Sequence, residues 1–197
     1  MDRIRLIAIK YEGRFRKRRR PSLLAEIDLL LSTGSLRAMS SESETNEDRP
    51  GVPIAPPLLF VIPILVSIVI EHFFPTVFVH GPVRWIAGVL LVAFGVALNI
   101  VGFITQKRAG TDPIPFNPTT KIVSHGLYRF SRNPMYIGFA FWTLGVAILI
   151  NSLWALMAVP IGLILIDLLV VAREEGYLER KFGEEYLSYK RRVRRWI

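Results

Sequence analysis

The sequence of 197 residues contains no cysteine and only three histidines. The absence of cysteine excludes a disulfide scaffold, thiol catalysis, iron–sulfur clusters and cysteine zinc sites. His72, His80 and His125 are scattered, without a partner at metal-ligand spacing, so the sequence predicts no metal site. The chain is nevertheless unusually apolar, with 51% hydrophobic residues, while its formal net charge is +9. Apolar and charged residues must therefore be segregated along the chain.

The basic excess lies in three blocks: residues 1–57 carry a net charge of +3, residues 105–136 of +4 and residues 173–197 of +3. Four apolar stretches alternate with the charged parts of the chain. They are Ile54–Ile70, Val83–Ile104, Ile137–Ile150 and Leu153–Ala172. Two of them reach the about 20 residues that cross a bilayer core as a helix, Ile54–Ile70 is at the short limit, and Ile137–Ile150 is too short unless residues 134–136 extend it. Asn151 and Ser152 alone separate the last two stretches, which predicts a tight helical hairpin.

This alternation predicts an all-α fold, a polytopic membrane helical bundle of about four spans. Four spans place both termini and the 105–136 loop on one side, and the positive-inside rule assigns that side to the cytoplasm. The expected partner of the apolar surface is the lipid bilayer. The basic charge is explained by topology, so we expect no nucleic-acid partner.

Residues 1–50 are predicted to be a disordered basic and polar extension, and residues 51–197 to form the membrane domain. A polybasic contact with anionic lipid is the alternative for the extension. A start at Met39 is also open, so the sequence does not settle whether residues 1–38 belong to the mature protein.

Two features of the spans concern packing. Gly88, Gly95 and Gly102 recur every seven residues and share one helix face, where small residues allow close approach of helices. This packing can occur within one chain or between two, so the oligomeric state stays open. Asp167 lies inside the last stretch, seven residues before Glu174, and the two are expected on nearly one face. Either they line a polar cavity, or Asp167 pairs with Asn99 or water.

The loop before the third stretch carries the first chemical motif. It runs Ser-His-Gly-Leu-Tyr-Arg-Phe-Ser-Arg-Asn-Pro-Met-Tyr-Ile-Gly over residues 124–138. Proline restricts φ and glycine permits unusual φ values, so the loop is predicted to be ordered. Interfacial anchoring by Tyr and Arg is the simpler interpretation, but anchoring does not require this spacing.

The second motif follows the last stretch and opens with the pair Glu174–Glu175. From Leu178 onward, apolar residues recur every three or four positions, which predicts an amphipathic C-terminal helix on the membrane or the bundle, with Gly183 as a possible interruption. Its polar face suits anionic headgroups through Arg191, Arg192, Arg194 and Arg195. The glutamate pair is either a solvated helix start or a binding site for a nucleotide-like cofactor.

Together, the two motifs resemble the isoprenylcysteine carboxyl methyltransferase family, which is related to the phospholipid N-methyltransferases. The resemblance covers roughly residues 83–197 and implies a helical membrane enzyme that uses S-adenosylmethionine. By position, the family's cofactor-contacting residues fall on Lys121, Ile122, Val123, Tyr128, Asn133, Pro134, Met135, Tyr136 and Glu174. We add Arg132 as a cofactor ligand and assign Arg173 and Glu175 to the catalytic set, with Arg173 orienting the acceptor.

Two departures from the family pattern concern the substrate. Asn133 stands where members that act on prenylated proteins usually have His, and Val170 stands where they carry an Arg, so Arg173 is the nearest candidate. A prenyl-cysteine substrate therefore does not follow from the resemblance. The resemblance implies methyl transfer to a lipophilic acceptor, an isoprenoid carboxylate or a phospholipid amine. An NADPH-dependent membrane reductase of the sterol-reductase type and a non-catalytic membrane protein are the alternatives.

Overall fold

The computed structural model describes residue 29 and residues 48–78 and 81–197, and the part described below is Asp48–Ile197. Most of the predicted N-terminal extension lies outside the described residues. From Asp48 onward, the described residues form helices and no strands. In chain order they are α3 (Leu58–Phe73), α4 (Val83–Arg108), η1 (Gly126–Arg129), α5 (Pro134–Ile150), α6 (Leu153–Ile166), η2 (Asp167–Val171), α7 (Ala172–Phe182) and α8 (Glu184–Arg192). The predicted all-α fold is confirmed.

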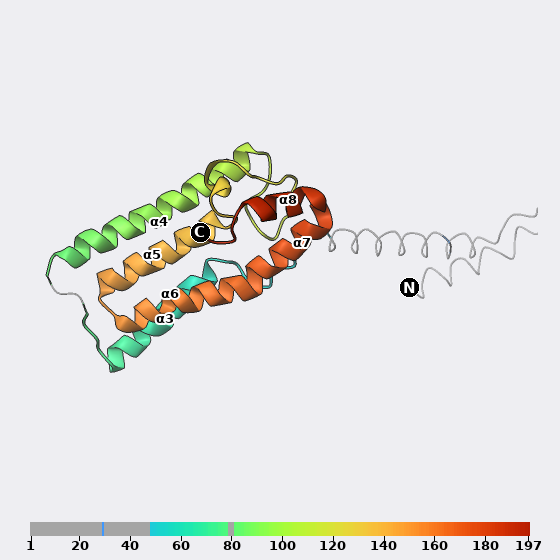
Figure 1. Cartoon of the computed structure of the whole chain (residues 1–197). Coiled ribbons are helices and arrows are strands. Elements are labelled where there is room, and N and C mark those ends of the chain that lie inside the picture. Colours follow the sequence, from blue (N-terminus) through green and yellow to red (C-terminus); the bar gives the residue numbers. More distant parts are fainter. Residues whose placement is uncertain (1–28, 30–47, 79–80) are drawn as a thin grey trace, which may run out of the picture. The chain divides into compact units, whose positions relative to one another are not determined.

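The four long helices form a bundle in which α4 packs on α5, α5 on α6, and α6 on α3 (Figure 1). The tight hairpin predicted between α5 and α6 is present. Asn151 adopts the left-handed conformation with φ 56°, which asparagine tolerates better than most residues. Ser152 then caps α6 by accepting a hydrogen bond from the Ala155 amide. Two polar residues therefore suffice to reverse the chain.

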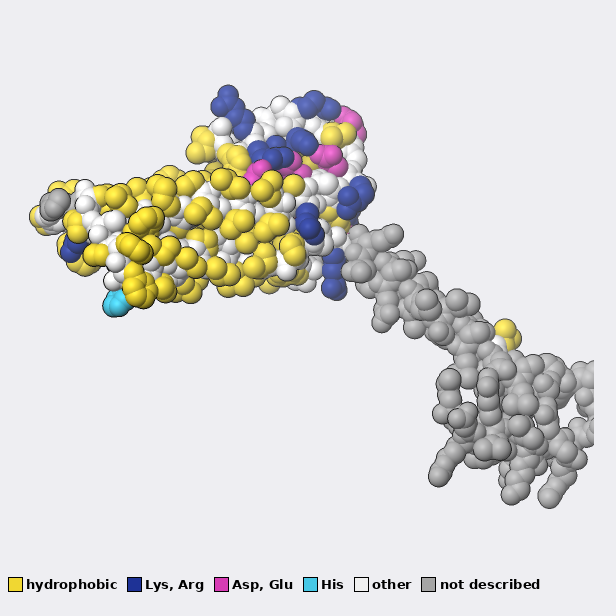
Figure 2. Space-filling model, turned by 90° about the horizontal axis from the view of Figure 1, so that it is seen from below, with side chains coloured by type: hydrophobic (Ala, Val, Ile, Leu, Met, Phe, Trp, Pro, Cys, Tyr) yellow, Lys and Arg dark blue, Asp and Glu magenta, His cyan; other side chains and the backbone are white. Residues whose placement is uncertain are grey.

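The outer surface of the bundle is apolar, as expected for contact with lipid. Val83–Arg108 and the continuous helical stretch Leu153–Phe182 are each long and apolar enough to cross a membrane, while α3 and α5 are shorter apolar helices. Only 17% and 33% of the two apolar windows is buried, whereas a core helix of a soluble protein is mostly buried. Figure 2 shows hydrophobic side chains along the bundle and most of the charged ones gathered at one end.

The glycines of α4 and α5 face each other and bring the two backbones into contact. A Cβ atom on Gly95 would lie 2.5 Å from the Gly138 carbonyl oxygen, and one on Gly88 would lie 3.0 Å from that of Gly145. A Cβ atom on Gly102 would instead contact the side chain of Met135. The predicted close-packing role of these glycines is therefore confirmed, and here the contact lies within one chain.

We expect Gly95→Ala to lower the stability of the protein by about 1–3 kcal/mol, the usual effect of overpacking a dense contact. The added methyl would meet main-chain atoms of Gly138 and Trp142, which cannot rotate away. Thermal unfolding in detergent measures the loss. The control is Ala97→Val, because Ala97 is exposed on the same helix. Equal melting temperatures for the two variants would contradict the packing assignment.

The C-terminal segment packs on protein, which settles the alternative left open by the sequence. Gly183, with φ 52°, separates α7 from α8 as its position suggested. Beyond this break Tyr186, Tyr189 and Val193 form a buried cluster, against which Ile122 of the long loop packs. The apolar face predicted from Leu178 onward therefore faces the loop and brings α8 to the charged end of the bundle.

Candidate functional site

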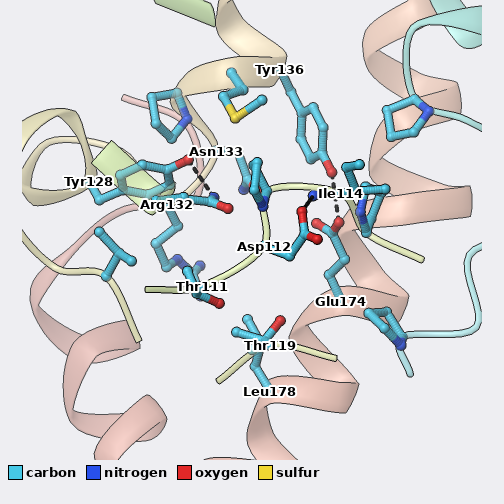
Figure 3. Close-up of a pocket in the computed structure, with 18 of the residues that line it drawn as sticks. Thr111, Asp112, Ile114, Thr119, Tyr128, Arg132, Asn133, Tyr136, Glu174 and Leu178 are labelled. Carbon is cyan, nitrogen blue, oxygen red and sulfur yellow. Dashed lines mark hydrogen bonds between the residues drawn. The ribbon is translucent and has the colours of Figure 1, made fainter. Parts of the chain in front are cut away.

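A cavity of about 360 Å³ lies at the charged end of the bundle (Figure 3). Its size falls in the usual range of small-molecule sites, 300–1,000 Å³. The walls come from the long loop between α4 and α5, the start of α5, the helices α7 and α8, and the segment before α3. The two sequence motifs, some 40 residues apart, therefore meet at one cavity.

The residues predicted from the sequence gather here, with one exception. All ten predicted cofactor ligands line the cavity: Lys121, Ile122, Val123, Tyr128, Arg132, Asn133, Pro134, Met135, Tyr136 and Glu174. Glu175, predicted as catalytic, also lines it. Arg173 does not line the cavity, and its guanidinium donates to the Gly51 carbonyl at 2.9 Å. The binding and catalytic roles of all these residues stay predictions.

Glu174 and Tyr136 meet at one side of the cavity. Pro134 at the first helical position starts α5 and places Tyr136 in its first turn, while Glu174 lies in the first turn of α7. The Tyr136 hydroxyl donates to Glu174 Oε1 at 2.7 Å. Among the described residues, Glu174 forms no ion pair. Its carboxyl group therefore lines the cavity without a neutralising cation among these residues.

Glu175 faces a different environment, although it is the next residue. Arg195 binds its carboxylate with two hydrogen bonds, from Nε to Oε1 at 3.0 Å and from Nη2 to Oε2 at 2.7 Å. Arg132 Nη1 lies 3.1 Å from Oε1, and Lys190 Nζ lies 3.7 Å from Oε2. Both Glu175 and Arg132 are more than nine-tenths buried. Three cations thus compensate Glu175, which favours a structural role.

Asp167 belongs to this same charge cluster, contrary to the sequence prediction. Arg195 Nη1 contacts its two carboxylate oxygens at 3.2 and 3.3 Å, while Asn99 donates instead to the Gly95 carbonyl. The prediction that Asp167 shares a face with Glu174, or pairs with Asn99, was wrong. The π-helical turn η2 begins at Asp167 and shifts the helical register by about one residue. Asp167 therefore shares its partner with Glu175, eight residues on, and does not line the cavity.

The C-terminal residues tie the first motif in place. The Arg132 amide donates to the Arg194 carbonyl at 3.0 Å, and the Asn133 side chain donates to the Arg195 carbonyl, also at 3.0 Å. The Ser131 hydroxyl reaches the same Arg195 oxygen at 3.3 Å. Asn133 is thus partly used in holding the main chain, a role that an amide performs well.

Three buried tyrosines complete the wall next to α8. The Tyr189 hydroxyl donates to the Tyr128 carbonyl at 2.8 Å, and Gln106 donates to the Tyr128 hydroxyl. Burial raises the pKa values of Tyr128 and Tyr189, and burial together with the charge of Glu175 raises the pKa of Tyr186 to about 12. These phenols remain protonated at neutral pH and act as hydrogen-bonding groups, not as bases.

Sequence reasoning missed two parts of the site. It assigned Arg195 to anionic headgroups together with its exposed neighbours, yet Arg195 holds Asp167 and Glu175. The cost of a carboxylate within an apolar stretch was the available signal, because such a group requires a partner. It also missed Pro50, Ala55, Pro56 and Pro57, which line the cavity. No motif marks these residues.

Comparisons with known proteins agree with the resemblance seen in the motifs. Protein-S-isoprenylcysteine O-methyltransferase B of Arabidopsis thaliana is 29% identical over 147 residues, which cover 69% of this chain and 70% of that protein. The corresponding enzyme of Rattus norvegicus is 32% identical over 122 residues, covering 56% of this chain and 40% of its own length. Across these and the plant relatives, the match spans between 40% and 70% of the relative.

A solved structure and a family model complete the comparison. The eukaryotic intramembrane Ras methyltransferase, isoprenylcysteine carboxyl methyltransferase, matches with a TM-score of 0.43 and 23% identity, over 68% of this chain and 49% of that one. The phospholipid methyltransferase family model matches residues 83–185, a stretch that holds the first motif and the glutamate pair. Since this match covers more than half of the sequence, the chain belongs to the phospholipid methyltransferase family.

Proposed function

We propose that this integral membrane protein is a methyltransferase that moves a methyl group from S-adenosylmethionine to a lipophilic acceptor. The observation that carries the proposal is the cavity at the charged end of an apolar bundle, lined by both motifs of the family. An isoprenoid carboxylate and a phospholipid amine are the two acceptor classes that the relatives and the family description suggest.

The side chains of the cavity suit S-adenosylmethionine. Glu174 offers a carboxylate that no cation of the described residues neutralises, and it suits the hydroxyls or the amine of the cofactor. The buried Arg132 Nε has no hydrogen-bond partner among the described residues, whereas Nη1 lies 3.1 Å from Glu175 Oε1, so Nε is the donor that remains for a carboxylate of the cofactor. We assign Glu174, Arg132 and Tyr136 to cofactor binding.

Methyl transfer requires the protein mainly to align the acceptor with the methyl group and to exclude water. When bound, the cofactor supplies a sulfonium methyl that is already activated for in-line displacement. Glu175 and Arg195 hold Arg132 and the first motif in position, while Pro134 and Met135 add apolar surface to the wall. A carboxylate acceptor requires no base, and an amine requires only that it be neutral.

We propose further that the termini and the 105–136 loop face the cytoplasm. Lys and Arg side chains gather at the cavity end of the molecule (Figure 2), and the positive-inside rule assigns such an end to the cytoplasm. The polar cofactor would then enter from the aqueous side, where it is made.

Ligand-dependent stability tests the proposal. S-adenosylhomocysteine at about 100 times its Kd should stabilise the detergent-purified protein by about 2.7 kcal/mol, and NADPH should not. Membranes incubated with methyl-labelled S-adenosylmethionine should then carry label in the lipid fraction. Base-labile label identifies an ester, and stable label an amine product. Stabilisation by NADPH alone would indicate a reductase instead, and stabilisation by neither ligand a non-catalytic protein.

A further inference from the structure

The ten residues before α3, Asp48–Pro57, form a strap that is fixed to the rest of the domain at three points. Asp48 accepts a hydrogen bond from Tyr177 at 3.2 Å and pairs with Lys181. The Gly51 carbonyl accepts from Arg173. Val52 is buried in one cluster with Tyr136 and Val170. The strap is therefore held beside the Glu174 side of the cavity by residues that flank Glu174 in the sequence.

The strap presents an apolar wall to the cavity, through Pro50, Ala55, Pro56 and Pro57. Three of these four residues are prolines, which have no amide hydrogen to donate. The carbonyl groups of Ala55, Pro56 and Pro57 accept hydrogen bonds from the first amides of α3. This wall consequently offers hydrocarbon surface and almost no hydrogen-bonding capacity, and its prolines make it stiff.

The opposite wall is polar. Arg132 and Thr111 line this part of the cavity, and Figure 3 shows Tyr128 and Arg132 across from Tyr136 and Glu174. A cofactor rich in hydroxyl and charged groups fits the space between Arg132 and Glu174, whereas a hydrocarbon chain fits the apolar surface of the strap. The strap leads directly into α3, whose Ile62 and Leu65 are exposed on the outer surface.

We propose that the strap Asp48–Pro57 is the acceptor-side wall of the site and selects the acceptor by the shape of its hydrocarbon chain. This inference rests on the proposed methyltransferase function. The strap lies outside the family match at residues 83–185, as do the lining residues Tyr186 and Tyr189, so the family pattern does not dictate the strap wall. Arg173, Tyr177 and Lys181 are positioning residues that act through the strap. Arg173 thereby orients the acceptor indirectly.

Thiol labelling tests the wall directly, because the chain contains no cysteine. Ala55→Cys places a thiol on the cavity wall, and Pro53→Cys places a matched control on the exposed part of the strap, outside the lining. Each is labelled with a water-soluble maleimide in the presence of S-adenosylhomocysteine. The two added probes are N-acetyl-S-farnesylcysteine and phosphatidylethanolamine vesicles, which separate a prenyl chain from an acyl chain.

One of the two probes at ten times its Kd should slow the labelling of Ala55→Cys about tenfold and leave Pro53→Cys unchanged. Equal labelling rates of Ala55→Cys with and without each probe would overturn the proposal. Wild-type protein that S-adenosylhomocysteine does not stabilise would instead overturn the proposed function. The two failures are therefore distinguishable.

Kinetics of the anchor residues provide a second measurement. Arg173→Ala and Lys181→Met each remove one attachment of the strap, so both should raise the acceptor KM about three- to tenfold while kcat and S-adenosylhomocysteine affinity stay unchanged. Arg173→Lys keeps a donor for Gly51 and should recover much of the loss. If Arg173→Ala raised the acceptor KM and Lys181→Met did not, Arg173 would contact the acceptor itself. That result would refute the action of Arg173 through the strap.

Discussion

Glu174→Gln is expected to weaken the binding of S-adenosylhomocysteine by one to two orders of magnitude. Hydrogen bonds to a charged group contribute about 1.5–3 kcal/mol net, and Gln loses the charge while keeping the size of the side chain. Gln can also accept the hydrogen bond from Tyr136, so the wall of the cavity should keep its shape. Isothermal titration calorimetry on detergent-purified protein measures the change.

The control for this variant is Glu184→Gln. Glu184 begins α8 and pairs with Arg191, and both side chains are largely exposed to solvent. Glu184→Gln changes the net charge of the protein by the same amount as Glu174→Gln, and Glu184 does not line the cavity. We expect wild-type affinity for Glu184→Gln. Unchanged affinity in Glu174→Gln would refute the assignment of Glu174 as a cofactor ligand.

Glu175→Gln is expected to affect stability more than any other single charge removal at this site. Arg132 has 9% of its side-chain surface exposed and Glu175 has 7%, so the substitution leaves a buried guanidinium without its carboxylate. Breaking a buried pair in this way typically costs about 3–5 kcal/mol. For a chain of this size the melting temperature should fall by roughly 10 °C, as tryptophan fluorescence can follow.

A double variant separates this loss from a loss of packing. Arg132→Met in the Glu175→Gln background removes the uncompensated guanidinium, and part of the lost stability should return, since apolar replacement of buried ions is often neutral. Glu184→Gln again serves as the exposed control, where an ion pair contributes at most about 1 kcal/mol. A melting temperature of Glu175→Gln equal to that of Glu184→Gln would contradict the structural role of Glu175.

The two adjacent glutamates have different environments, and the sequence did not predict this difference. Glu174 and Glu175 are adjacent, and the motif marked both as site residues. Their partners come from residues 132, 136, 190 and 195, which lie in three separate segments. Their environments differ because helical geometry turns neighbouring side chains by about 100°. One carboxylate therefore faces Tyr136 and the other a cluster of cations, a division that adjacency in sequence does not reveal.

Local patterns were sufficient for the apolar helices, the α5–α6 hairpin, the α4–α5 glycine contact and the two motifs that line the cavity. Apolar length, small-residue spacing and turn residues act over a few positions, so they can be interpreted without knowing the fold. The partners of Asp167 and the position of Arg173 depend on the π-helical turn η2 and on the strap. These features arise from contacts between residues 20 to more than 100 positions apart, and only the packed chain brings such residues together.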